Sequence, residues 1–454
     1  MERSSLNFSK WAIASLFLSL LWSCQPEQVE EVQANVPEEI LAPEEASGKF
    51  PYRRLSTYGF FEGELDQLSP SEAIIPYQPA SSLFTDYALK SRFAYLPEGE
   101  KAVIAGEELN LPQGTILIKN FYYPSDFRNP EGERRIIETR LMIHEENGWQ
   151  AYPYVWNDSQ TDAVLKVVGA EKEVRFINQA GEEQVINYLV PNKNQCKSCH
   201  NKNESLAPLG VQTRHLNHPI TFAEGSENQL AHWAKLGKLE GFLGKAAHPS
   251  LVNYEDQSLT LNDRAMAYLD INCSHCHRAE GPASTSGLFL TYGQQDPLKL
   301  GVFKTPVAAG KGSGKHTYDI VPGQAEASIL LHRMNSTEIG VAMPEIGRTS
   351  IHEEGVALIR AWINQMNYKL KTNEKGPDKS DPFSFAILLI LHVVATDHSR
   401  EIFSVHACNV GDRNAFWTFC FTSTCIGTST ESFGIHLSHH FFSSSFALHL
   451  SLRQ

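Results

Sequence analysis

The sequence predicts an α+β protein in which an N-terminal antiparallel β-rich domain is followed by mostly α-helical domains. In the first half, Asn147-Gly148 lies between two apolar runs, which is a strong signal for a β-hairpin. A second hairpin is expected around the turn residues 178–181. In the second half, apolar residues recur at helical spacing after Thr260 and again after Ser350.

The N-terminus has the order of a targeting segment. Arg3 and Lys10 precede the apolar residues 11–22, and Cys24 follows. This order resembles a bacterial lipoprotein signal over residues 1–24, with Cys24 as the lipidated first residue of the mature chain. Trp22 stands where a small residue is usual, so an ordinary cleaved signal or an uncleaved anchor is the alternative. We expect an exported protein on the periplasmic side, anchored to the outer membrane as a lipoprotein.

Two segments of different composition follow. Residues 25–49 are rich in Glu and Pro and contain few aromatic residues, so they cannot bury enough apolar surface to become ordered. We expect a disordered acidic tether there, and a partner-binding acidic patch is the alternative. Residues 50–190 form the predicted β-rich domain, either a β-sandwich or a half-barrel.

The feature with the clearest chemistry is a repeated motif of the form Cys-x-x-Cys-His. It occurs as Cys196, Cys199 and His200, and again as Cys273, Cys276 and His277. This spacing attaches a c-type haem, because two thiols can each add to a vinyl group of one porphyrin while the adjacent His ligates the iron. The sequence therefore predicts two covalently attached haem c groups, with the two histidines as proximal iron ligands.

The segments around the motifs favour helices. Ser226 can cap one helix, Thr260 can cap a helix that leads into Cys273, and Ser350 can begin a capping box for a closing helix. We expect residues 191–257 to form a first haem c region. Residues 258–370 are the predicted second domain, of the cytochrome c type.

The sequence indicates a sixth ligand for the second iron more clearly than for the first. Met343 is followed by Pro344, which presents the thioether from an extended loop, so we expect Met343 to be the sixth ligand of the second iron. The alternatives at that iron are Met334, His332 and His316. For the first iron His215 and His218 are candidates, and an open position is equally consistent with the sequence.

Composition bears on the possible partners of the protein and on the nature of its C-terminal tail. The chain has 454 residues and a formal net charge of −13, whereas nucleic-acid binding needs a basic stripe, so we expect no nucleic-acid partner. Residues 371–454 are crowded with Phe, Ser and His and show no sustained periodicity. We expect this atypical tail to be disordered or non-native.

From about residue 50 to residue 366 the chain resembles a family of exported bacterial diheme c-type cytochromes, which are largely uncharacterised and sometimes encoded beside a β-helix-type protein. Besides both haem motifs, the strings that carry the resemblance are Pro76-Tyr77, residues 83–88, 114–119, 138–141, 154–157 and 320–323, and Met334-Asn335-Ser336. The resemblance implies two covalent haems and electron transfer, and it carries no physiological substrate.

Three functions are compatible with these features. The first is an exported diheme c-type cytochrome that passes single electrons to or from a redox partner protein, as an electron-transfer protein rather than a stand-alone catalyst. The second is a diheme oxidoreductase whose first haem is an open catalytic site, peroxidase-like or acting on another small molecule. The third is a haem-bearing docking module for a periplasmic dehydrogenase.

Overall fold

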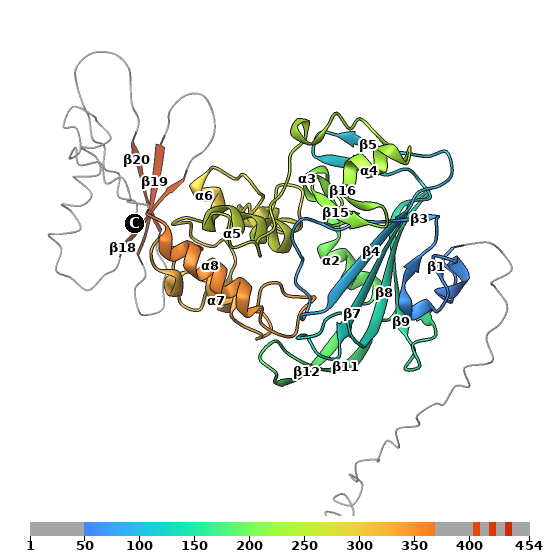
Figure 1. Cartoon of the computed structure of the whole chain (residues 1–454). Coiled ribbons are helices and arrows are strands. Elements are labelled where there is room, and N and C mark those ends of the chain that lie inside the picture. Colours follow the sequence, from blue (N-terminus) through green and yellow to red (C-terminus); the bar gives the residue numbers. More distant parts are fainter. Residues whose placement is uncertain (1–49, 368–402, 409–416, 424–431, 438–454) are drawn as a thin grey trace, which may run out of the picture. The chain divides into compact units, whose positions relative to one another are not determined.

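The computed structural model describes residues 50–367, which we call the main unit, and three short strands farther along the chain (Figure 1). These strands are β18 (Phe403–Cys408), β19 (Trp417–Ser423) and β20 (Ser432–Leu437), and they pair in that order as an antiparallel sheet. The predicted signal with Cys24, the predicted tether and most of the predicted tail lie outside the described residues.

The largest element of the main unit is a six-stranded antiparallel sheet with the order β10-β9-β8-β7-β4-β3 (Figure 1). Its strands are β3 (Ile74–Pro76), β4 (Leu89–Tyr95), β7 (Ile116–Pro124), β8 (Arg134–Glu145), β9 (Gly148–Trp156) and β10 (Ala163–Leu165). The predicted hairpin at Asn147-Gly148 is confirmed, since Glu145 pairs with Gly148 across the β8–β9 turn. Gly148 has a φ of 92°, a conformation that favours glycine.

Smaller sheets surround this one. The second predicted hairpin is confirmed as β11 (Ala170–Ile177) and β12 (Glu183–Val190). Two-stranded antiparallel sheets are formed by β1 (Phe61–Glu62) with β2 (Ser69–Pro70), β13 (Asn201–Lys202) with β14 (Ser205–Leu206), and β15 (Pro219–Phe222) with β16 (Gly225–Asn228). A three-stranded sheet joins β5 (Ala102–Ala105), β6 (Glu108–Asn110) and β17 (Leu239–Glu240), and β17 runs parallel to β5.

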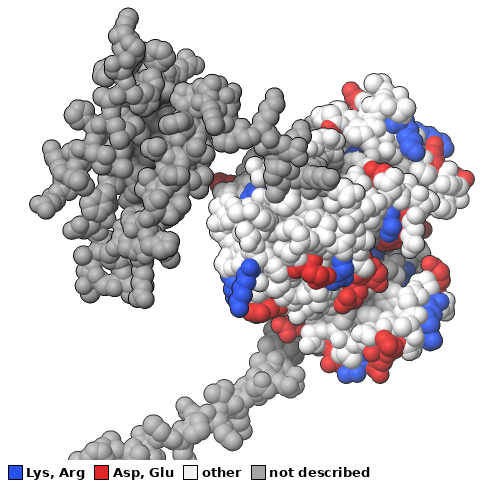
Figure 2. Space-filling view, turned by 90° about the vertical axis from the view of Figure 1, so that its left-hand side faces the viewer, with Lys and Arg blue, Asp and Glu red and all other residues white. Residues whose placement is uncertain are grey.

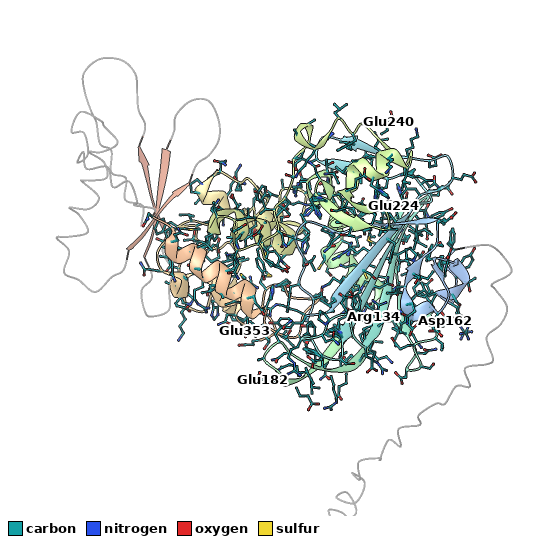
Figure 3. The ribbon with its side chains drawn as sticks, in the orientation of Figure 1. Arg134, Asp162, Glu182, Glu224, Glu240 and Glu353 are labelled. Atoms are coloured by element: carbon teal, nitrogen blue, oxygen red, sulfur yellow. The ribbon has the colours of Figure 1, made fainter. Side chains whose placement is uncertain are left out.

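Charged side chains hold the first described residues against the edge of the large sheet. Asp162 accepts hydrogen bonds from the backbone N–H of Ser56 at 3.1 Å and from its hydroxyl at 2.7 Å (Figure 3). Arg134 donates to the carbonyl oxygens of Asp66 and Gln67. On the face shown in Figure 2, acidic and basic side chains are intermixed beside wide uncharged areas.

The helices are short, and most of them follow the large sheet in the chain. They are α2 (Lys193–Cys199), α3 (Thr213–Leu216), α4 (Gln229–Lys235), α5 (Leu261–Leu269), α6 (Pro297–Leu300), α7 (Ile329–Met334) and α8 (Glu353–Gln365). The predicted cap at Thr260 is confirmed, because its side chain accepts from the N–H of Asp263. None of the helices in the described part of the chain is long and apolar enough to cross a membrane.

Two other predicted caps are wrong. Asn228 rather than Ser226 caps α4, since its side chain accepts from the N–H groups of Leu230 and Ala231. At α8 the N-cap is His352, while the Ser350 hydroxyl donates to Asp86 at 2.7 Å. The hydroxyl that local spacing predicted as a helix cap therefore donates instead to the Asp86 carboxylate, which is distant in the sequence.

The predicted fold class, a β-rich domain followed by mostly α-helical cytochrome c-type domains, is wrong. The described chain is β-rich, with 29% strand and 23% helix, and small sheets continue after residue 190. The reason lies in the packing of residues 191–257. Leu230 and Trp233 of α4 belong to the same buried cluster as Ala94 and Leu117 of the large sheet, so this stretch completes the sheet's core instead of forming a helical domain.

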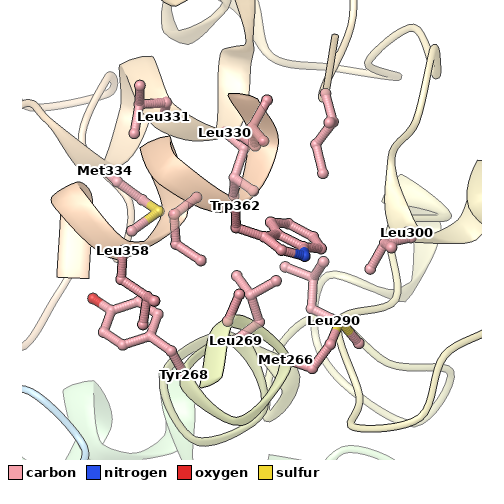
Figure 4. Close-up of a cluster of buried hydrophobic side chains, with 14 of the residues drawn as sticks. Met266, Tyr268, Leu269, Leu290, Leu300, Leu330, Leu331, Met334, Leu358 and Trp362 are labelled. Atoms are coloured by element: carbon pink, nitrogen blue, oxygen red, sulfur yellow. The ribbon is translucent and has the colours of Figure 1, made fainter. Parts of the chain in front are cut away.

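A second buried cluster joins α5, α7 and α8 (Figure 4). Its members include Met266, Leu269, Leu290, Leu300, Leu330, Leu331, Met334, Leu358 and Trp362. The indole N–H of Trp362 donates to the Asn262 side chain at 3.1 Å, which satisfies the one polar atom of this large side chain.

A buried ion pair connects the first and second motif regions. Arg214 of α3 donates from Nε and Nη2 to the two carboxylate oxygens of Asp270, at 3.0 and 2.9 Å. Asp270 directly follows α5, and its side chain is fully buried. Such a bidentate contact fixes both distance and orientation between its two segments.

We expect Asp270→Asn to lower the free energy of unfolding by about 2 kcal/mol, because the buried Arg214 guanidinium loses its buried carboxylate partner and keeps only the exposed Glu107. Glu326→Gln is the matched control, since it breaks the exposed pair with Arg360 and should lose under about 1 kcal/mol. Urea titration of the full chain measures both values. Equal losses in the two variants would contradict the structural role given to this pair.

The pH dependence of stability should report on His352. Its ring stacks on Phe84 with centroids 4.2 Å apart, and burial lowers the pKa of His352 to about 4. The pKa of His352 is lower in the folded state than in the unfolded state, so protonation destabilises the fold. The stability tied to the neutral ring is present above about pH 6.5 and is lost as pH falls toward 4. The free energy of unfolding of the wild-type protein should fall between pH 7.5 and pH 4. We expect His352→Gln to make this fall smaller by up to about 3 kcal/mol. Parallel stability curves for the two proteins would refute this.

Candidate functional site

The first motif is presented by a capped helix. The Asn192 side chain accepts from the N–H of Gln195 at 2.9 Å, and the Gln195 side chain accepts from the N–H of Asn192, which is a complete capping box. The helix α2 that starts there carries Cys196 and Cys199, and His200 ends it. Two thiols three positions apart therefore lie one helical turn from each other, next to the histidine.

The His200 ring is oriented as a metal ligand requires. Its Nδ1 lies 3.0 Å from the carbonyl oxygen of Ala207, so Nδ1 carries the proton and Nε2 keeps a free lone pair. Burial lowers the pKa of His200 to about 3, and the charge of Lys119 adds to the effect. The imidazole is therefore neutral at physiological pH, which is the form that ligates iron.

A cavity separates the first motif from the large sheet. Its volume is about 40 Å³, which has room for a few water-sized groups and is well below the roughly 300–1,000 Å³ that small-molecule sites occupy. Cys196 and His200 line it on one side, and Tyr77, Lys119 and Arg140 line it on the other. The cavity thus has two of the three motif residues on one wall and two cations on the opposite wall.

The second motif follows α5 through an irregular turn. Residues Asp270–Ser274 form a π-helical turn that contains Cys273, and the N–H of His277 then bonds to the carbonyl oxygen of Cys273 at 2.9 Å. π-Helical turns occur frequently at functional sites. Gly281 packs directly on the motif, because a Cβ at this position would clash with the carbonyl oxygen of Cys276.

His277 has a more open environment than His200. Its Nδ1 lies 3.5 Å from the Ser286 hydroxyl. Burial lowers the pKa of His277 to about 4, while a hydrogen bond to the backbone of Leu288 opposes the shift. Both histidines of the motifs are therefore neutral, and each has a partner on the nitrogen that would not face a metal.

The structure brings the two motifs together, although they lie 77 positions apart (273 − 196). The Cys276 thiol donates to the carbonyl oxygen of Ser198 at 3.9 Å. A hydrogen bond from the Cys276 thiol also lowers the pKa of Cys199 below its ordinary value. The N–H of Asn203 bonds to the carbonyl oxygen of Glu280 at 2.9 Å, so the loops that follow the motifs are in contact as well.

Met343 lies on a loop that one arginine holds. The Met343 N–H donates to the carbonyl oxygen of Arg333 at 2.9 Å, and the Met343 carbonyl accepts from Arg348 at 2.9 Å. The same Arg348 nitrogen, which has two N–H groups, also lies within 3.3 Å of the carbonyl oxygens of Arg333, Met334 and Ser336. Arg348 thus positions the loop, a role that its place in the sequence does not suggest.

The other second-site candidates have structural partners. Met334 is buried in the core of α5, α7 and α8, near Leu331 and Leu358 (Figure 4). His316 and His332 pack on each other, with ring centroids 5.4 Å apart. Met343, in contrast, is half-buried on its loop.

The two candidates for the first iron differ. Both ring nitrogens of His218 are engaged, with the carbonyl oxygens of Pro219 at 3.0 Å and Gln78 at 2.8 Å. His215 is buried, its Nε2 lies 3.9 Å from Asp270, and its Nδ1 has no hydrogen-bond partner in the described chain. His215 is therefore the candidate with an unused nitrogen.

The residues of the first motif fit a covalent haem. The helix supplies two thiols, and His200 supplies a neutral imidazole with the tautomer that ligation needs. The cavity of about 40 Å³ would have to widen to admit a porphyrin. Among residues 50–367 and the three short strands, no group of three or more His, Cys, Asp and Glu side chains is arranged to hold a metal ion by itself. A haem does not require one, because the porphyrin supplies the equatorial ligands.

Comparison with known proteins assigns no further role to these residues. No family model matches the chain, and neither a curated protein nor a solved structure does.

Proposed function

We propose that this protein is an exported diheme c-type cytochrome that transfers single electrons. Cys196 and Cys199 would attach the first haem, Cys273 and Cys276 the second, and His200 and His277 would be the proximal ligands. The observation that carries the proposal is the contact between the motifs, since the Cys276 thiol reaches the carbonyl of Ser198 within the first motif. Two haems attached there would lie close enough to exchange electrons directly.

The chain's own residues set the conditions for the redox chemistry, which the haem supplies when bound. Ala207 holds the His200 ring in one tautomer through its carbonyl oxygen. The ion pair of Arg214 with Asp270 keeps the two motif regions at a constant separation. A constant separation matters because electron-transfer rates depend steeply on distance, whereas no bond to a substrate has to form.

The two sites would differ in their sixth ligand. We infer that Met343 ligates the second iron, with its loop positioned by Arg348. A thioether favours the ferrous state and raises the potential relative to an imidazole. The first iron would have His215 or an open position, because the nitrogens of His218 are already engaged. An open position would favour the diheme oxidoreductase as the second candidate function.

The remaining parts of the proposal concern location and partner. We propose that the protein lies on the periplasmic side and is held at the outer membrane by lipidation of Cys24. Its partner would be a redox protein, as donor or acceptor, and a docking role toward a periplasmic dehydrogenase is compatible with the same site. Mass spectrometry of the mature N-terminus from a membrane fraction tests the anchor directly.

The haem content provides the first test. We expect two haems per chain by pyridine haemochrome, and one in the double variant Cys196→Ala/Cys199→Ala. Mass spectrometry should find haem adducts on the motif peptides. A Cys199–Cys276 disulfide in their place would refute the proposal, since the contact between these thiols makes that pairing the natural competitor. The remaining haem should also change its midpoint potential in the double variant, because a charged neighbour has been removed.

The second test concerns Met343. We expect Met343→His to lower the midpoint of one haem by on the order of 0.1 V, within the roughly 0.8 V that axial ligands span. Met334→Leu is the matched control, because that side chain is buried in the core and should leave both potentials unchanged. Redox titration with visible and near-infrared spectra follows both haems. Two midpoints that are indistinguishable, and unchanged by Met343→His, would rule out ligation by Met343.

A further inference from the structure

Three cations stand directly opposite one another on the large sheet. Arg92 of β4 pairs in register with Lys119 of β7, and Lys119 pairs with Arg140 of β8. Like charges at directly opposed positions destabilise a sheet. Lys90, two residues before Arg92 on β4, adds a fourth cation to the same face.

The described residues do not balance this charge. Glu138 is the one carboxylate in contact with the row. Its Oε1 accepts from Arg140 and from the Tyr188 hydroxyl at 2.6 Å, and its Oε2 is buried without a hydrogen-bond partner in the described chain. The Phe121 ring lies 4.8 Å from Lys119 Nζ and 4.3 Å from the Arg140 guanidinium, but cation–π contacts contribute only about 0.5–2 kcal/mol each. Within the main unit, neither the Arg92 guanidinium nor the Lys119 ammonium forms an ion pair.

The row faces the first motif. Lys119 and Arg140 line the cavity whose other wall holds Cys196 and His200. Arg140 Nε is buried without a hydrogen-bond partner in the described chain. Burial, together with the Arg92 charge, holds the pKa of Lys119 well below its ordinary value, so its ammonium form is disfavoured unless an anion lies beside it. Basic side chains with unpaired donors are thus concentrated around a space of about 40 Å³, which has room for a small anionic group.

We propose that Arg92, Lys119 and Arg140 form an anion-binding row that holds carboxylate or oxyanion groups in the cavity of the first motif. An anion there would neutralise the like charges and use the unpaired donors, and charge-assisted hydrogen bonds of this kind are the strong ones. Two sources have the same chemistry. One is the pair of propionate groups of a haem attached to Cys196 and Cys199, which rests on the proposed function, and the other is a small free anion.

The test compares the full-length protein with Lys119→Met, Arg92→Met and Lys119→Arg. Lys172→Met is the matched control, because Lys172 lies on β11 and is paired with Asp158. Redox titration gives the midpoint of each haem. Thermal unfolding in increasing inorganic phosphate shows whether the row takes a free anion, and that measurement needs no haem.

Haem propionates in the row predict that Lys119→Met and Arg92→Met lower the midpoint of the first haem alone, because a cation nearby stabilises the reduced state. Phosphate would then leave the Tm of the wild-type protein unchanged. A free-anion site predicts instead that phosphate raises the Tm saturably and that Lys119→Met weakens its apparent affinity about tenfold or more. Lys119→Arg should keep the wild-type behaviour in either case.

The proposal is overturned if Lys119→Met and Arg92→Met match Lys172→Met in both measurements. A protein without haem would contradict the proposed function alone, and the phosphate titration of that protein would still decide whether the row binds anions. If Lys119→Met fails to fold, Arg92→Met removes a neighbouring cation of the same row and gives the same reading.

Discussion

The buried pairing of Arg214 with Asp270 is the constraint on which the arrangement of the two motifs depends. Arg214 lies in the short helix α3 after the first motif, and Asp270 lies three residues before Cys273. Neither charge can be buried alone without a large free-energy cost, so each holds the other's segment in place. This pairing explains why two motifs far apart in the sequence meet, with Cys276 reaching the backbone of Ser198.

The large sheet is a second determinant of the site because it supplies the wall opposite the first motif. Its strands β7 and β8 contribute Lys119 and Arg140 at positions where apolar residues would pack more favourably. Natural proteins tolerate such local conflicts mainly where function requires them. The segment 191–257 closes over this wall and shares its apolar core, so the first site is built from both the β-rich region and the motif helix.

Local sequence signals were reliable where a short-range interaction decides the structure. The hairpin at Asn147-Gly148 and the cap at Thr260 are confirmed because a turn and a hydroxyl act within a few residues. Ser350 does not cap α8 because a long-range contact decides its hydrogen bonding: its hydroxyl donates to Asp86, 264 residues away in the sequence. The fold class failed on the same ground: apolar residues at helical spacing, such as Leu230 and Trp233, pack on a sheet that local periodicity cannot reveal.

The sequence by itself determined the chemistry of the proposed site, because the spacing of Cys196, Cys199 and His200, and of its repeat, is a local property of the chain. The charged residues on the large sheet were visible in the sequence but carried no assignable role, since a lysine in a strand does not show which face it lies on. Only the tertiary structure decided that Lys119 and Arg140 face the first motif, that Arg348 holds the Met343 loop and that the two motifs touch. These are contacts between residues far apart in the chain, and they arise from packing and long-range ion pairs rather than from local periodicity.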